Sequence, residues 1–307
     1  MPKPLFLPLL VLLMTLAVGG VRGQDLDTRS LESGYATLVS FEAQPEISAA
    51  RLTVDSDDSN ASDLDIDTAK VPLYREFPLA GGEKRWFLQA TGSYLSMSET
   101  FGLELSAELT EELELDWTGY GALVEAGLVF PLTDSLEIAP SIGLGVTRLE
   151  NEADFTSPVI EEALAGRLDG VLYNWDTLAS VVRLSSALRY DREFGTWRIK
   201  GSAYLSGSYI DSFDESDRFG GFTDEAANFG MSLDASHPLG WKVRDYPVFI
   251  IGHLGLTQFL GADRDALGFS SFGEAGVSLG IERFTLGVLG AIGGDVRGWN
   301  LLFNYDY

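Results

Sequence analysis

The sequence contains no cysteine and only two histidines, His237 and His253, and these absences remove several kinds of site. Disulfide frameworks and zinc centres with thiolate ligands are excluded. A bacterial lipoprotein is excluded as well, because its lipid is attached to a cysteine at the cleavage point. Secreted eukaryotic domains usually carry disulfides, so an exported chain without cysteine fits a bacterial envelope better.

Basic side chains and long apolar runs are also scarce. The chain has 21 Lys and Arg against 46 Asp and Glu, which gives a net charge of −25. Few basic groups are available to neutralise phosphates, so we expect no nucleic-acid partner. Beyond residue 23 no apolar run is long enough for a membrane-spanning helix. If the chain spans a membrane, it must do so as a closed barrel, because open strand edges cannot be hydrogen-bonded in lipid.

The N-terminus has the three parts of a secretory signal peptide. Lys3 supplies charge, residues 5–18 are apolar, and residues 19–23 are mostly small. We therefore expect a signal peptide over 1–23, cleaved between Gly23 and Gln24. The alternative is an uncleaved membrane anchor. A short N-terminal segment over 24–33 and one barrel domain over 34–307 would follow.

Apolar residues alternate with polar or small ones along much of the chain. The alternation is clearest over 136–147 and recurs over 117–130, 197–209 and 271–282. A soluble β-sandwich also alternates. These runs, however, exceed the typical strand of about 5–6 residues, and Trp and Tyr gather near their ends, as an interfacial belt requires. The pattern predicts an all-β fold, a transmembrane antiparallel up-and-down barrel rich in glycine and aromatics.

The connections between these runs alternate between short and long, as in outer-membrane barrels with periplasmic turns and extracellular loops. Counting them predicts twelve strands, with ten as the fallback because the first two, near 34–54 and 69–79, are the least regular. The short connections are 79–84, 131–135, 191–196 and 282–285, and the long ones are 55–68, 99–114, 150–174, 211–226 and 261–270.

Acidic residues concentrate in the predicted long loops, so we expect an anionic external rim. The segment 55–67 does not match a calcium-binding EF-hand loop, because it lacks glycine at the sixth position and glutamate at the twelfth. Weak binding of divalent cations by these loops is one interpretation, and a simply solvated surface is the other. In the third loop, residues 157–170 have the capping pattern of a short helix.

The C-terminal strand resembles that of bacterial outer-membrane proteins, because Leu301, Phe303, Tyr305 and Tyr307 fall on one face and the last residue is aromatic. With the strand count, the chain resembles autotransporter-type β-barrels. Only 24–33 precede the first expected strand, so the closer resemblance is to the solitary barrels without a passenger. This resemblance implies a Gram-negative outer membrane, with lipopolysaccharide, periplasmic chaperones and the barrel-assembly machinery as partners. The last would recognise 301–307.

Charged residues on the predicted polar strand faces are the main candidate site. Ionisable groups facing a barrel lumen must pair or meet water. They would either form a salt-bridge network that closes the barrel or line a narrow pore, since twelve strands lie between the filled and the open sizes. The candidates are Arg183, Arg189, Arg198 and Lys200 on two neighbouring strands, with Glu125, Glu137, Glu274 and Glu282 on others.

A catalytic site is not expected from the sequence. His237 lies beside a predicted short turn, at the wrong end for an outer-leaflet lipase. His253 shares a strand face with Gly255 and Thr257, and no nearby Ser and Asp complete a triad. We therefore expect no enzyme activity, cofactor or metal. The functions left open are an envelope-structural or surface-interaction role, a narrow channel for small solutes or ions, and, least favoured, a lipid-modifying enzyme.

Overall fold

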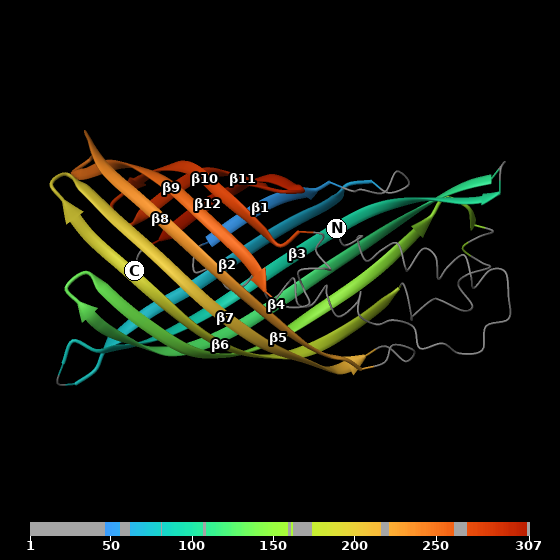
Figure 1. Ribbon diagram of the computed structural model, residues 1–307, viewed down its shortest axis with the longest axis horizontal. Coiled ribbons are helices and arrows are strands. Elements are labelled where there is room, and N and C mark those ends of the chain that lie inside the picture. The colour runs from blue at the N-terminus through green and yellow to red at the C-terminus, as the bar shows by residue number, and fades with distance from the viewer. Residues whose placement is uncertain are drawn as a thin grey trace.

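The computed structural model describes residues 47–55, 62–80, 82–106, 109–158, 161, 174–215, 221–260 and 269–305. Twelve antiparallel strands close into one barrel, in which β1 pairs with both β2 and β12 (Figure 1). The all-β fold and the count of twelve are therefore confirmed. The strands are β1 Ile47–Val54, β2 Leu64–Pro78, β3 Arg85–Ser106, β4 Leu109–Thr133, β5 Leu136–Phe155, β6 Trp175–Phe194, β7 Trp197–Glu215, β8 Thr223–Val243, β9 Tyr246–Leu260, β10 Ser271–Ile281, β11 Phe284–Gly293 and β12 Val296–Tyr305.

Short turns join the strands at one end of the barrel, at the left in Figure 1. Several turns contain a residue with positive φ, including Gly195 at 64° and Glu282 at 56°. Such left-handed positions match the twist of tight hairpins. The predicted place of Glu282 on a polar strand face is wrong, because β10 ends at Ile281 and Glu282 is exposed in the turn.

The strands are longer than the alternation alone suggested at the opposite end. Residues expected in long loops belong instead to β2, β3, β4, β5, β7 and β8, and the β3–β4 hairpin extends beyond its neighbours at the right of Figure 1. Continued strand pairing provides hydrogen bonds for the backbone N–H and C=O groups, and it does not require the side chains to be buried. Strands with acidic side chains can therefore extend into water. Asp65 and Asp67 are consequently on β2, and part of the predicted acidic loop is paired strand.

The outward face carries an apolar band between aromatic residues, as a lipid-facing surface requires. Leu144 and Leu184 are each 63% exposed on this face. Tyr94 and Tyr120 contact each other towards the long-loop end, and Trp197 lies at the short-turn end. Beyond the band, the outer face carries ion pairs, including Arg51 with Asp67 at 2.6 Å.

No helix among the described residues is both long and apolar enough to cross a membrane. Of the helix expected over 157–170, Pro158 and Glu161 are helical, and the Glu161 amide donates to the Ser157 carbonyl at 3.1 Å. The rest of that helix, the signal peptide over 1–23 with Gly23 and Gln24, and the segment 24–33 lie outside the described residues.

Candidate functional site: the barrel lumen

The lumen has two chemically different halves. At the long-loop end, most inward side chains are apolar and buried, and they pack into one cluster, which we call the apolar half. Such a lining disfavours a continuous column of water. The lumen residues predicted from the sequence were all charged, so none of this cluster was among them. Its members include Leu52, Ile66, Leu95, Trp117, Leu149, Val181, Ile210, Phe259, Phe272 and Val296.

Near the short turns, a charged hub joins strands that are far apart in sequence. The Arg85 guanidinium donates to both oxygens of Glu137 at 2.7 Å and to Glu76 at 2.5 Å. Arg189 donates to Glu76 at 3.0 Å and to the Tyr74 hydroxyl at 2.8 Å. The Tyr74 hydroxyl in turn donates to Glu76. Two arginines and two glutamates therefore neutralise one another within the hub.

Two aromatic rings pack against the guanidinium of Arg189 in the hub. The Arg189 guanidinium lies over the ring of Tyr74 at 5.1 Å and over that of Phe87 at 5.6 Å. Phe87 is buried, and the side chain of Arg189 is only 32% exposed. Shared, charge-assisted hydrogen bonds in partly desolvated surroundings hold each member in one position. Glu76, Arg85 and Tyr74 were not predicted from the sequence; Arg189 and Glu137 were.

A second polar layer lies between the hub and the apolar half. Glu125, Gly143 and Arg183 are neighbours in register across β4, β5 and β6. A Cβ at position 143 would lie 2.7 Å from Glu125 Cγ and 3.5 Å from Arg183 Cβ. Glycine therefore lets the two charged side chains share the space above it. Arg183 is 1% exposed and donates to Ser208 at 3.1 Å, and Glu125 accepts from Ser185 at 3.1 Å.

Arg198 and Lys200 lie at the short-turn end of β7. Arg198 forms a two-point ion pair with Asp191, at 2.8 and 2.6 Å, in which both side chains are almost half exposed. Lys200 is in register between Asp191 and Asp234. Of the eight charged residues predicted, all but Glu282 face the lumen, but the structure gathers them into separate groups rather than one cluster.

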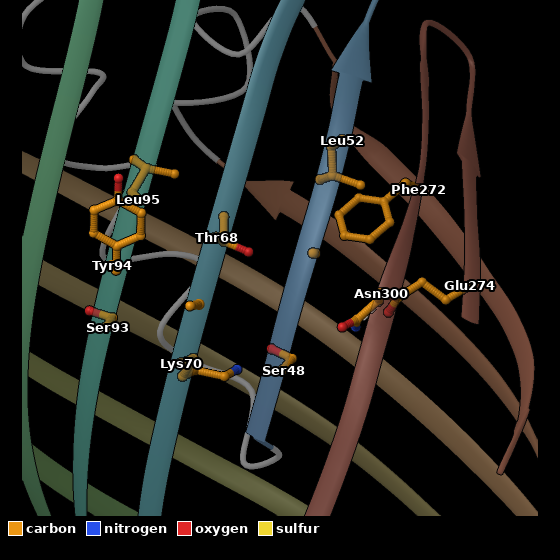
Figure 2. A pocket seen from close by; sticks show the side chains of 12 residues that line it. Ser48, Leu52, Thr68, Lys70, Ser93, Tyr94, Leu95, Phe272, Glu274 and Asn300 are labelled. Carbon is orange, nitrogen blue, oxygen red and sulfur yellow. Dashed lines mark hydrogen bonds between the residues drawn. The ribbon is translucent and has the colours of Figure 1, made fainter. Parts of the chain in front are cut away.

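Two cavities border the lumen wall near β1, β10 and β12, and Ser48, Glu274 and Asn300 line both. Figure 2 shows Lys70 and Ser48 on neighbouring strands, with Asn300 beside Glu274. The Asn300 amide donates to Glu274 at 3.1 Å. Asn300 is 6% exposed, and no hydrogen-bond partner reaches its side-chain oxygen among the described residues. The second cavity reaches His253 and Asp234.

His253 has the two partners that were not expected. Its Nδ1 lies 2.7 Å from an oxygen of Asp234, and its Nε2 lies 2.6 Å from the hydroxyl oxygen of Ser278. The three residues come from the adjacent strands β8, β9 and β10, where Asp234 faces His253 directly in register. The conclusion that no Ser and Asp complete a triad with His253 is therefore wrong. Asp234 and Ser278 lie 19 and 25 residues from His253 in the chain, so no local sequence pattern indicated that the three meet.

The remaining predicted residues lie elsewhere. His237 is on the outer side at the short-turn end, where its ring contacts Trp197 and its Nε2 lies 3.1 Å from Thr196 Oγ1. Leu301 and Phe303 face outward on β12, and Tyr307 lies outside the described residues. Tyr305 is the last residue of β12. Within the described ranges, no group of three or more His, Asp or Glu side chains is arranged to hold a metal ion.

Comparison with known proteins places the fold. The model of a family described as the solitary outer membrane autotransporter beta-barrel domain matches residues 37–307. No curated protein sequence matches the chain. Among solved structures, the transport unit of the Escherichia coli autotransporter AIDA-I is similar, with 11% identity, a TM-score of 0.51, and coverage of 92% of this chain and all 100% of that one. The β domain of the Bordetella autotransporter BrkA covers 85% of this chain and 97% of its own, at 13% identity and a TM-score of 0.48.

Proposed function

The chain belongs to the family of solitary outer-membrane autotransporter β-barrels, and on that premise we propose that it is a non-conducting barrel with an envelope-structural and surface-interaction role. The family places it in the bacterial outer membrane. The proposed role needs no turnover of a substrate. The observation that carries it is the lining of the lumen. A solute crossing the barrel would have to pass the charged hub at one end and the apolar half at the other.

The charged hub supports closure at the short-turn end. Its carboxylates and guanidiniums are bonded to each other, so they offer few open positions to a passing ion. The apolar half opposes conduction for a different reason, because a hydrophobic constriction tends to exclude water and ions. A channel for small solutes or ions, the alternative function, would require water to cross both regions.

The outer surface at the long-loop end supports the surface-interaction part of the proposal. Arg297 pairs with Asp55 at 2.5 Å and with Asp63 at 3.1 Å, and Arg148 pairs with Asp176 at 3.1 Å. We propose that this ring of arginines and carboxylates contacts lipopolysaccharide, with its phosphates meeting the arginines and divalent cations bridging to the carboxylates.

The route to the membrane is part of the same proposal. The chain would be exported with cleavage between Gly23 and Gln24. Periplasmic chaperones would then deliver it to the barrel-assembly machinery, which would read the terminal strand. Support comes from Leu301 and Phe303, which project outward where a receptor could reach them.

Planar-bilayer recording of the purified protein tests the closed lumen. We expect no discrete conductance steps. Arg85→Ala combined with Arg189→Ala opens the hub but keeps the apolar half, so it should also stay silent. Arg198→Ala, in the exposed pair with Asp191, is the matched control. Regular single-channel steps in the unmodified protein would contradict the proposal and favour the channel.

A further inference from the structure

We propose that Ser278, His253 and Asp234 form a nucleophilic centre that hydrolyses small carboxylic esters within the lumen. This activity goes beyond the structural role and does not depend on whether the lumen conducts. The first support is geometric. A serine oxygen 2.6 Å from one imidazole nitrogen and a carboxylate 2.7 Å from the other are the distances that an acyl-transfer triad requires.

The chemistry of the three groups fixes their protons. A carboxylate accepts hydrogen bonds, so the Asp234 oxygen holds the proton on His253 Nδ1. His253 Nε2 is then an acceptor, and the Ser278 hydroxyl donates to it. This is the tautomer that a general base needs. Asp234 acts as a positioning residue, and Ser278 and His253 would touch the reacting atoms.

Local packing favours this arrangement. Gly276 and Gly280 flank Ser278 on the inward face of β10, and Gly287 lies opposite it in register. A Cβ at position 287 would be 2.4 Å from the Cβ of Ser278. Position 276 is the register partner of His253, and a Cβ there would lie 2.6 Å from Leu289 Cα, so glycine fits closely against β11 beside the imidazole. A larger residue at position 287 would push Ser278 out of its place beside the histidine.

A substrate would reach the centre through the second cavity. His253 and Asp234 line it. Ser278 lies just behind His253, with its hydroxyl oxygen 2.6 Å from His253 Nε2. Leu289 and Leu302 supply an apolar side for a short acyl chain, and Asn300 supplies an amide. One hydrogen of that amide bonds to Glu274, and we assign the other as the donor to the oxyanion that forms during attack. The substrate class is therefore a small carboxylic ester with a short acyl chain.

The reaction balances with water as the only co-reactant. Ser278 Oγ bonds to the ester carbonyl carbon while its proton passes to His253 Nε2. The bond from that carbon to the alcohol oxygen then breaks, and the alcohol leaves with the proton from His253. Water repeats the sequence on the acyl-serine, which releases the carboxylic acid and restores Ser278.

Diisopropyl fluorophosphate labelling of the purified full-length protein, read by intact mass and peptide mapping, tests the nucleophile. Ser278 oxygen would bond to phosphorus and fluoride would leave. We expect one adduct, on Ser278. His253→Gln, which can keep hydrogen bonds to both neighbours, should slow labelling by about a hundredfold or more. Ser206→Ala is the control, because Ser206 is a buried serine that donates to Asn228 and not to a histidine.

Hydrolysis of p-nitrophenyl acetate and butyrate tests turnover. Ser278→Ala should reduce the rate to that of detergent alone. Asp234→Asn should lower it by about tenfold or more, and Asp234→Glu should restore part of it, a rescue that a purely structural carboxylate would not produce. Heat-modifiable migration on gels confirms that each variant is folded. A folded wild-type barrel that gives no Ser278 adduct, or a His253→Gln variant that labels as fast as the wild type, overturns the proposal.

Discussion

The two halves of the lumen face the same interior but are stabilised by opposite means. The apolar half consists of buried, packed aliphatic and aromatic side chains. The charged hub consists of groups that would be costly to bury singly and are tolerable because each has a partner. The difference shows that a barrel of intermediate size can be filled either by apolar volume or by paired charge.

Placing a charge in the apolar half should have the largest effect. Leu95 is fully buried, and Leu95→Asp would put an unpaired carboxylate among apolar neighbours. We expect a loss of about 4 kcal/mol or more, enough to prevent recovery of folded barrel. Leu95→Met keeps the volume and should cost less than about 1.5 kcal/mol. Urea unfolding in detergent micelles compares the two, and equal stabilities would refute the distinction between the halves.

Removing a charge from the hub should have the next largest effect. Arg189→Ala leaves Glu76 with one arginine partner and removes the guanidinium from the Tyr74 ring. Because both side chains are about a quarter to a third exposed, we expect a loss of about 2 kcal/mol, below the value for fully buried pairs. A double-mutant cycle with Glu76→Gln isolates the pair. A coupling energy near zero would mean that the hub is held by packing alone.

A smaller effect is expected in the layer between the halves. Gly143→Ala adds a methyl group 2.7 Å from Glu125 Cγ, so the glutamate must move away from Arg183. We expect a cost of about 1 kcal/mol, because the flexible glutamate side chain can move. Gly207→Ala is the control, since nothing lies within 4 Å of a Cβ at that position. Differential unfolding of the two variants measures the crowding. The prediction fails if alanine is tolerated equally at both glycines.

The smallest effect is expected outside both halves, on the exposed Arg198–Asp191 pair. Arg198→Ala should change the free energy of unfolding by less than about 1 kcal/mol, because water screens the charges and already solvates both side chains. Raising the salt concentration should reduce even this difference. A loss comparable to that of Arg189→Ala would show that the hub extends to the barrel rim.

Alternation predicted the fold well because each strand of a lipid-embedded barrel must present apolar groups outward. It predicted strand ends poorly, since Asp65 and Asp67 continue the pairing of β2 beyond the apolar band and resemble loop residues. The lumen was harder still. Arg189 and Glu137 were identified as candidates, but Glu76 lies 113 residues from Arg189 in the chain. Such partners depend on register across several strands, which no local pattern encodes.

The arrangement around His253 illustrates the same difficulty. Glu274 was predicted to lie on a polar strand face, and His253 was predicted to share a strand face with Gly255 and Thr257. The contact between His253 and Asp234 requires the register of β8 and β9, which shifts between Pro238 and Lys242 near the turn. An irregularity of this kind displaces the pairing of every residue beyond it, so the partner of His253 could not be found by counting from the turn.

The pairing of β1 with β12 determines how the protein can be made. Ser48 is hydrogen-bonded in register with Leu302, near the opposite end of the chain. Closure therefore joins the most distant parts of the sequence, and no partial barrel has both of its edges satisfied. Folding must wait for the last hairpin, and the loop-closure entropy of nearly the whole chain opposes it. Until β1 pairs with β12, each of these strands has an edge of unpaired backbone groups that can pair with another chain.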